Sequence, residues 1–562
     1  MARLVLGPLL RYVDDSTATI WVETDAPCEV TVLGASSRTF TVHGHHYALV
    51  DVTGLGPGSS ITYTVELDGQ RVWPPPDSYL PPSRIRTLQP DGSLRLAVGS
   101  CRRNATHDES AVAELGHDAL RAYGNRLADR DEESWPGALV LIGDQVYADA
   151  LWKAMREVIA ARRDPGEPPG WEIADFEEYT QLYRLYWSDP VVRWLLSTVP
   201  SMMIFDDHDV RDDWNISRAW LKRMEAQPWW RERVTAGLGA YWIYQHLGNL
   251  SPKERADDPL LTALRSDERS RASLAETTAV DRGAILDELA WHADQQRDGR
   301  WNYARDIGGT RVVVLDSRGG RVLDPGERLM LGPRQLAWLD EQARGDMDHL
   351  LIVTSIPYLL PSGIHHLEAW NEALCNGAWG ARVAEKSERF RQRFDLEHWA
   401  SFQRSFAALA DIVTELATGG RGEPPASITF LSGDVHYSYL ARVRTPLDAA
   451  PIHQVVSSPI RNQLPWKLRC AVRVASLGVV GPVSGALARA AGVRSTPLNW
   501  SHTHGNWFSN VLAEIHLRGR EATVRWHTPA SEQAYGPGAE PLMRELGAAD
   551  ITRHATVPRQ KL

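Results

Sequence analysis

Apolar runs that alternate with helical stretches restrict the fold of this chain more than any other feature of its sequence. Runs of aliphatic and β-branched residues occur at 93–101, 138–142, 201–205, 311–315, 349–354 and 427–431. Such alternation is typical of α/β proteins, whose strands are buried and largely parallel. We therefore expect an α/β domain over residues 91–530, with helical insertions at about 251–300 and 461–500.

The two ends of the chain have different patterns. Residues 1–88 contain at least five short alternating or β-branched runs, broken by glycines and without helical periodicity. This pattern predicts a β-sandwich domain of immunoglobulin or fibronectin type, and the prolines at 74–76 and 81–82 form a stiff exit from it. The polar residues 531–562 predict a loosely ordered C-terminal tail.

Composition and charge exclude several classes of protein. The formal charge of −10 argues against general nucleic-acid binding. The four cysteines lie far apart and form no CxxC pair, so the sequence indicates neither a zinc ribbon nor a disulfide framework. The first residues resemble a strand rather than a signal peptide, so we expect a cytoplasmic protein. No oligomeric state is predicted.

Residues with reactive or metal-binding side chains are concentrated where the apolar runs end. They are Cys101, Asp144, Tyr147, Asp206, Asp207, His208, Asp209, Asp212, Asp213, Asp434 and His436. Carboxylates gathered at one sheet edge repel one another unless cations neutralise them. Carboxylates suit hard cations, whereas thiolate, phenolate and imidazole suit a transition metal. We expect a mixed multinuclear metal site, of the kind that attacks phosphate esters with a metal-bound hydroxide.

Each of these residues by itself also has a purely structural interpretation. A lone Cys101 is typical of a small buried hydrophobe, and a lone Tyr147 of a core aromatic residue. Asp434 and His436 together are equally typical of a turn-capping carboxylate beside a surface histidine. Their joint occurrence at successive strand ends favours metal ligation.

Four motifs follow one another in order at these strand ends. They are Gly99-Ser-Cys101, Gly143-Asp-Gln-Val-Tyr147, Asp206-Asp-His-Asp209 and Ser432-Gly-Asp-Val-His436. The set resembles the alkaline phosphatase D (PhoD-like) family of the calcineurin-like metallophosphoesterase superfamily, over about residues 90–450. The resemblance implies a four-layer α/β/β/α catalytic domain, phosphomonoesterase or phosphodiesterase activity, and a centre of Fe3+ and Ca2+, with other divalent metals as alternatives.

The resemblance also implies a role for each residue of the motifs. Fe3+ would be bound by Cys101, Asp144, Tyr147 and His436, with Asp144 bridging to Ca2+. The calcium ligands would be completed from Asp434 and the 206–213 segment, chiefly Asp207 and Asp212. Asp212 and Asp213 stand where members of the family often carry an Asn pair, which adds a negative charge beside the calcium position.

Two further side chains are expected to act on the substrate. His208 has the position of the superfamily histidine that contacts the phosphate, which implies a role at the leaving group or in the transition state. Arg102 or Arg103 follows Cys101 directly, and an arginine there can bind a phosphate oxygen; we favour Arg103.

The segment 461–494 is basic and apolar. No acidic residue occurs between Asp448 and Glu514, and Arg473, Pro482 and Arg489 interrupt the apolar run too often for a transmembrane helix. Three interpretations remain open: a basic lid over an anionic substrate, a helix that lies on a membrane surface, and a buried helical hairpin.

The leading functional hypothesis is metal-dependent hydrolysis of phosphate esters. One alternative is a phosphodiesterase whose phospholipid or nucleotide substrate is held by the basic lid. Another is a non-catalytic, metal-stabilised binding protein, although the intact Asp144, His208, Asp434 and His436 argue against it. The nucleophile motif G-x-S-x-G of serine hydrolases does not occur.

Overall fold

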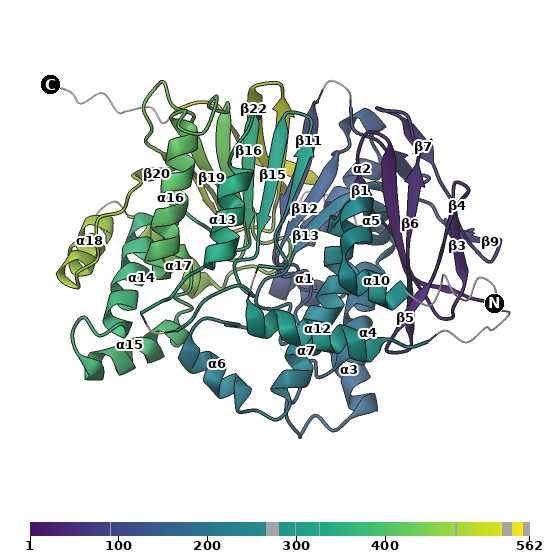
Figure 1. The fold of residues 1–562 in the computed structure, drawn as a ribbon, viewed down its shortest axis with the longest axis horizontal. Coiled ribbons are helices and arrows are strands. Elements are labelled where there is room, and N and C mark those ends of the chain that lie inside the picture. The colour runs from purple at the N-terminus through teal and green to yellow at the C-terminus, as the bar shows by residue number, and fades with distance from the viewer. Residues whose placement is uncertain are drawn as a thin grey trace.

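A computed structural model describes residues 1–89, 92–265, 280–297, 299–324, 326–477, 480–530 and 542–554. The N-terminal part is rich in β-structure, as its sequence predicts, and lies on the right in Figure 1. One sheet has the order β1-β2-β6-β5, from Leu4–Val13, Thr17–Thr24, His45–Thr53 and Phe40–Val42. A second has the order β4-β3-β8-β9, from Ala35–Arg38, Glu29–Val32, Val65–Leu67 and Gln70–Trp73. The short strands β7 (Ser60–Thr62) and β10 (Arg84–Arg86) pair separately.

The first of two large sheets has six strands. Its order is β13-β12-β11-β21-β22-β23, from Ser201–Ile204, Ala138–Ile142, Leu94–Gly99, Leu512–Arg518, Glu521–Pro529 and Met543–Asp550. β11, β12 and β13 are parallel, whereas the C-terminal strands are antiparallel to their neighbours. Every residue of β12 and β13 is buried, which explains why these strands are continuous apolar runs in the sequence.

The second large sheet has seven strands. Its order is β14-β15-β16-β17-β19-β18-β20, from Tyr303–Ile307, Thr310–Leu315, His349–Thr354, Ser427–Ser432, Ile452–Val456, Ser438–Val443 and Trp500–Trp507. β15, β16, β17 and β19 are parallel. The two large sheets touch: the Ser457 hydroxyl donates to the Val98 carbonyl (2.7 Å), and the Trp526 indole donates to the Val456 carbonyl (3.0 Å).

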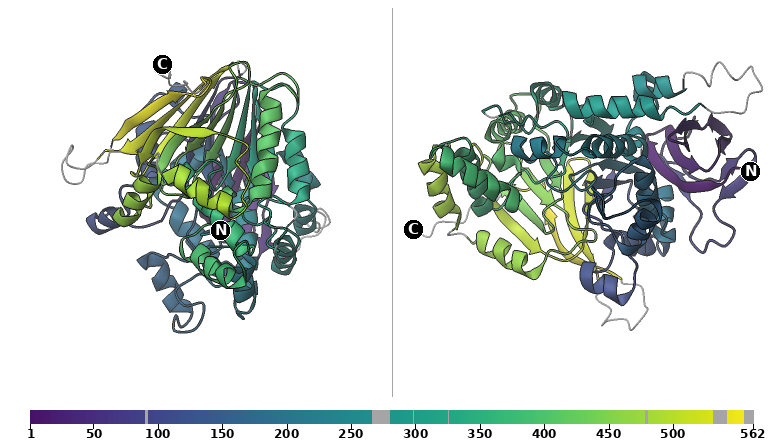
Figure 2. Two further views of the ribbon diagram at one scale, coloured as in Figure 1. Left: turned by 90° about the vertical axis from the view of Figure 1, so that its left-hand side faces the viewer. Right: turned by 90° about the horizontal axis from the view of Figure 1, so that it is seen from below.

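The helices lie around the two large sheets (Figures 1 and 2). Before residue 266 they are α1 (Glu109–Leu115), α2 (Ala119–Ala128), α3 (Lys153–Arg162), α4 (Phe176–Trp187), α5 (Pro190–Thr198), α6 (Arg218–Glu225), α7 (Trp230–Tyr241), α8 (Leu247–Asn249), α9 (Pro252–Asp257) and α10 (Pro259–Arg265). Several begin where the sequence signals a cap. The Asp189 carboxylate, for example, accepts from the N–H groups of Val191 and Val192, and Pro190 opens α5.

The later helices are α12 (Gly283–Gln296), α13 (Pro333–Gln342), α14 (Ser362–Cys375), α15 (Ala381–Arg393), α16 (Gln403–Ala417), α17 (Trp466–Ala475) and α18 (Val480–Ala490). Figure 2 (left) shows green and teal helices, the colours of α13 and α16, along one side of the strands. Residues 251–300, expected to be helical, contain α9, α10 and α12 among the residues described.

The C-terminal region differs from its prediction. Met543–Asp550 is strand β23, which pairs with β22 instead of forming part of a loose tail. Its polar sequence concealed this because an edge strand needs only backbone pairing and one covered face. Ala549 and Ile551 are buried, and Gly547 lies under the Trp507 ring. Residues 531–541 and 555–562 of the predicted tail lie outside the described residues.

The basic segment forms α17 and α18, and a buried hairpin is the wrong interpretation for α17. None of its residues is buried, whereas α18 packs against α14. In the part of the chain described, no single helix is long and apolar enough to cross a membrane; α17 and α18 pass such a test only together, as a pair bent by 76°.

Candidate metal centre

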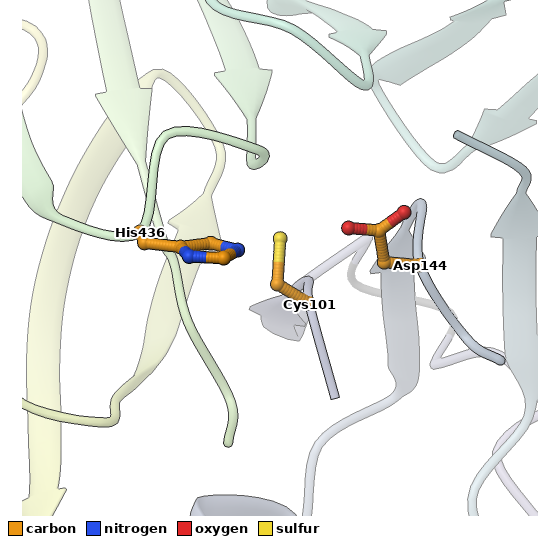
Figure 3. Close-up of side chains that lie close together, drawn as sticks. All are labelled: Cys101, Asp144 and His436. Atoms are coloured by element: carbon orange, nitrogen blue, oxygen red, sulfur yellow. The ribbon is translucent and has the colours of Figure 1, made fainter. Parts of the chain in front are cut away.

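The predicted ligands converge where strands of both large sheets end. Cys101 follows β11, Asp144 follows β12, and His436 follows β17 of the other sheet. One ligand atom from each of these three side chains lies within 4.8 Å of the others, and Figure 3 shows them pointing toward one another. The contact between the sheets therefore brings His436 beside Cys101, although the two residues are more than 300 positions apart in sequence.

Two further groups have the same ligand spacing. One contains Asp144, Asp206 and Asp207, and the other contains Asp207, His208 and Asp212. Asp144 belongs to the first two groups and Asp207 to the last two. The carboxylates shared between groups have the arrangement that bridging ligands need in a multinuclear centre.

The backbone at these ligands is in an uncommon conformation. Cys101, Asp144, Asp434 and His436 have left-handed φ angles of 57°, 53°, 63° and 55°. A non-glycine residue in this region costs about 1–3 kcal/mol, and such residues cluster at functional sites. Hydrogen bonds between the ligand loops offset the strain: the Asp144 N–H donates to the Asp209 carboxylate (2.8 Å), and the Cys101 N–H to the Gly143 carbonyl (3.3 Å).

Close contact between the loops requires a glycine at position 433. A Cβ there would lie 2.1 Å from the Ser100 hydroxyl oxygen and 2.9 Å from the Ile142 carbonyl oxygen. We expect Gly433→Ala to push the 434–436 loop away from β11 and β12. Overpacking of this kind costs about 1–3 kcal/mol, so thermal unfolding should occur at a lower temperature and bound metal should decrease.

The control for Gly433→Ala is Gly56→Ala, because a Cβ at Gly56 would meet no atom within 4 Å. Differential scanning fluorimetry and elemental analysis measure the two effects. A Gly433→Ala protein with unchanged melting temperature and metal content would contradict the close contact.

Tyr147 and Asn462 connect the ligands by hydrogen bonds. The Tyr147 hydroxyl donates to Asp144 Oδ2 (3.0 Å) and accepts from the Asn462 amide (3.1 Å). The same amide lies 3.4 Å from His436 Nε2. Burial, with the charges of His208 and Arg103, lowers the pKa of His436 to about 4, so its imidazole is neutral and able to bind a metal. Asn462 was not predicted, since it follows no strand-end motif.

The buried carboxylates of this site carry more negative charge than the neighbouring cationic side chains neutralise. Burial, and then the charges of Asp434 and Asp207, raise the pKa of Asp206 to about 8 despite a nearby arginine. Burial also raises the pKa of Asp144 well above its usual range. Asp144 Oδ1, Asp206 Oδ2 and Asp213 Oδ1 are buried and accept no hydrogen bond among the described residues. Orphaned carboxylate oxygens beside a thiol, a phenol and an imidazole fit the binding of metal cations.

Arg318 is a cation at this site that the sequence reasoning did not select. It follows β15, and its buried guanidinium contacts the carboxylates of Asp206 and Glu397. It also lies 3.2 Å from Asp207 Oδ1 and 3.6 Å from Asp434 Oδ1. The motif Asp316-Ser-Arg318 at a strand end was the available signal.

Asp434 is not part of the three ligand groups. His398 Nε2 lies 3.0 Å from Asp434 Oδ2, and His398 Nδ1 lies 2.7 Å from a carboxylate oxygen of Glu368. Burial alone would raise the pKa of Asp434, but the hydrogen bond from His398 and the charges of His398 and Arg318 hold it well below its usual range. The described structure thus ties Asp434 to protein cations. His398 lies away from any strand end, so no sequence signal indicated it.

His208 lies at the edge of the centre with a carboxylate partner. Its Nδ1 is 2.8 Å from Asp149 Oδ1, its Nε2 is 3.7 Å from Asp212 Oδ1, and its ring lies over Tyr147. Asp149 orients the imidazole so that Nε2 faces the ligand carboxylates. Asp149 was not predicted, although it is only five residues after Asp144.

The two candidate arginines have different surroundings. Arg102 is buried; its guanidinium forms an ion pair with the Asp118 carboxylate (2.8 Å) and donates a hydrogen bond to the Tyr186 carbonyl (2.7 Å). Arg103 is half-buried, 3.7 Å from Glu114 at the rim, and its charge reaches His436. Of the two, only Arg103 keeps access to a bound anion.

Together, the fold and the site define an α/β protein with a candidate multinuclear metal centre between two sheets. Residues 116–469 match the family described as PhoD-like phosphatase, and residues 1–85 match a domain of unknown function, DUF7800. Because the first match covers more than half of the chain, this chain belongs to the PhoD-like phosphatase family, and the predicted resemblance is confirmed.

Comparison with solved structures supports the fold. "Structure of PhoD" aligns over 99% of this chain and 93% of its own, with a TM-score of 0.58 and 12% identity. A maltogenic amylase from S. marinus reaches a TM-score of only 0.16 at 10% identity, over 93% and 76% of the chains. Among curated proteins, none matches this chain.

Proposed function

We propose that this chain hydrolyses phosphate esters in a metal-dependent reaction. The observation that carries the proposal is the set of three overlapping ligand groups at the ends of β11, β12, β13 and β17. Overlap of this kind suits two or more cations that share carboxylates, and such centres are the usual device for cleaving phosphate esters.

The donor types support a division of the centre into two parts. Cys101, Tyr147, His436 and Asp144 would hold a transition metal, for which we propose Fe3+. Asp207, which shares one ligand group with Asp206 and another with Asp212, would hold a hard cation together with these carboxylates, and for this cation we propose Ca2+. When bound, these ions supply charge stabilisation at the phosphoryl group and a nucleophile at neutral pH.

The chain's own residues have three tasks in this proposal. Arg103 binds a non-bridging phosphate oxygen at the rim of the centre. His208 donates a proton from Nε2 to the leaving oxygen, and Asp149 holds its ring through Nδ1. The hydrogen bonds of Asn462 fix Tyr147 and His436 relative to each other.

The test compares p-nitrophenyl phosphate with bis-p-nitrophenyl phosphate, each with and without a chelator. We expect hydrolysis of at least one ester, inhibition by the chelator, and iron and calcium in elemental analysis of the purified protein. A violet colour, from charge transfer between tyrosinate and Fe3+, would accompany iron at Tyr147. If protein reconstituted with both metals cleaves neither ester, the metal-stabilised binding protein becomes the better interpretation.

Finer features stay predictions of the sequence. They are the preference for a monoester or a diester, the four-layer order of the catalytic domain, the immunoglobulin-like identity of the N-terminal region, and a cytoplasmic location. The two large sheets in contact, with helices outside, support the four-layer order.

A further inference from the structure

Helix α17 presents an apolar face that the rest of the described chain does not cover. Trp466, Cys470 and Val474 are spaced at i, i+4 and i+8, so they share one side of the helix, and the 55% exposed Leu477 follows two residues after its end. Trp466 is 69% exposed and Val474 58%. A tryptophan that remains this exposed within an apolar stripe is unusual for a surface in contact only with water.

Helix α18 continues the same pattern. Its small residues form the buried side against α14: Gly481, Ser484, Gly485 and Ala488. This contact is tight, because a Cβ on Gly481 would lie 2.5 Å from the Ser362 hydroxyl oxygen. The larger Val483 and Leu487 are 63% and 43% exposed on the outside. Packing on α14 therefore selects small side chains and leaves the large apolar ones facing outward.

Basic residues surround these exposed apolar side chains. Lys467 and Arg473 lie on either side of the α17 stripe, and Arg489 and Arg494 are exposed on and just after α18. No acidic residue occurs from 449 to 513, although the chain as a whole carries a formal charge of −10. Because charges are screened over about 8–10 Å at physiological salt, this local positive surface acts independently of the overall negative charge.

Helix α17 is also close to the metal centre. It begins four residues after Asn462, whose amide contacts Tyr147 and His436. The Arg473 guanidinium lies over the Phe508 ring (5.2 Å), and Phe508 packs against Tyr437 (5.8 Å between ring centroids), which follows His436 directly. Figure 1 shows α17 and α18 beside α14, on the left of the molecule.

We propose that α17 and α18 form a docking face for an anionic lipid bilayer, with Trp466, Cys470, Val474, Leu477, Val483 and Leu487 entering the interface. An exposed apolar stripe with cations at its borders is the pattern of helices that lie in a membrane surface. A second copy of the chain fits less well, because a two-fold contact through this face would bring like charges together. The further expectation, that lipid headgroup phosphates reach the metal centre, rests on the proposed function; the docking does not.

The test measures docking without turnover. Purified full-length protein is sedimented with vesicles of phosphatidylcholine alone, or of phosphatidylcholine with phosphatidylserine. We expect co-sedimentation only with the anionic vesicles, and weaker binding as salt is raised. Inorganic phosphate and a chelator should leave vesicle binding unchanged. If the metal centre itself captured lipid headgroups, both additions would reduce the binding.

Variants separate the apolar and electrostatic contributions. Trp466→Ser with Val474→Ser should abolish vesicle binding, and Lys467→Gln with Arg494→Gln should weaken it by about fivefold for each cation removed. The matched controls are Leu447→Ser, an 84% exposed apolar residue elsewhere, and Lys253→Gln, an exposed cation on α9. Asp144→Asn should keep full vesicle binding, so failure of catalysis and failure of docking are distinguishable.

A fluorescent probe on Cys470 reports whether the α17 face enters the bilayer. Cys470 is exposed, Cys28 and Cys101 are buried, and Cys375 can be replaced by serine to leave a single accessible thiol. An environment-sensitive dye there should shift to the blue on addition of anionic vesicles. The proposal is overturned if the protein does not sediment with anionic vesicles, or if it does so and the Trp466 and Val474 substitutions do not reduce the sedimentation. It is also overturned if these substitutions disrupt a self-association of the protein and have no effect on vesicle binding.

Discussion

Asp144→Asn is expected to lose bound metal and phosphatase activity together. Asp144 belongs to two of the three ligand groups, one with Cys101 and His436 and the other with Asp206 and Asp207. Asparagine keeps the size of the side chain but removes the negative charge that two cations would share. Metal ions contribute several kcal/mol of transition-state stabilisation, so kcat should fall by about 10³-fold or more.

Stability distinguishes this result from misfolding. Burial, with the charges of Asp207 and Asp206, raises the pKa of Asp144, which means that the ionised carboxylate is costly without a cation. Metal-free Asp144→Asn should therefore unfold at the same or a higher temperature than the metal-free parent protein. The matched control is Asp294→Asn, a buried carboxylate on α12 that should keep both metal and activity. Full activity in Asp144→Asn would refute the ligand assignment.

His208→Ala should lose activity but retain metal. General acid catalysis contributes about 10²–10⁴-fold, and the imidazole lies between Asp149 and Asp212 at the edge of the centre. The loss should be larger for an alkyl phosphate than for p-nitrophenyl phosphate, because p-nitrophenolate leaves without protonation. Steady-state kinetics with both esters, and elemental analysis, measure the two effects.

Asp149→Asn tests how His208 is positioned. The substitution keeps an oxygen that can accept from Nδ1 but removes the negative charge that holds the imidazole protonated and oriented, so we expect a smaller decrease of about 10–100-fold, as for residues that orient a functional histidine. His292→Ala, an exposed histidine on α12, is the control. One outcome would contradict the role proposed for His208. If the metal content of His208→Ala falls as far as that of Asp144→Asn, then His208 is a metal ligand, and its assignment to proton transfer is wrong.

Residues next to strands were predictable from the sequence. The apolar runs at 138–142 and 427–431 are buried strands β12 and β17, and the side chains that follow them, Asp144 and His436, meet at the site. Local pattern suffices here because a parallel strand buried on both faces must be continuously apolar, and its carboxyl end is where such sheets carry their functional residues.

Residues that reach the site from elsewhere were not predictable in the same way. His398 precedes a short 3-10 turn far from any strand end, and Asn462 lies in the loop before α17, so neither carries a local signal. Both are placed by packing between distant segments. The same is true of the Arg318 guanidinium, which lies among the carboxylates of Asp206 after β13, Asp434 after β17, and Glu397.

By itself the sequence determined the α/β class, the strand ends, and the residue types that could bind metal, because these depend on burial patterns and side-chain chemistry within short segments. Only the tertiary structure decided that β11–β13 and β15–β17 lie in two different sheets, and that the Cys101 and Asp144 loops face His436 across their contact. It also decided that Asp434 pairs with His398 and Arg318, and that α17 is left uncovered. The contact between sheets and the covering of a helix are set by segments far apart in the sequence, where local pattern carries no information.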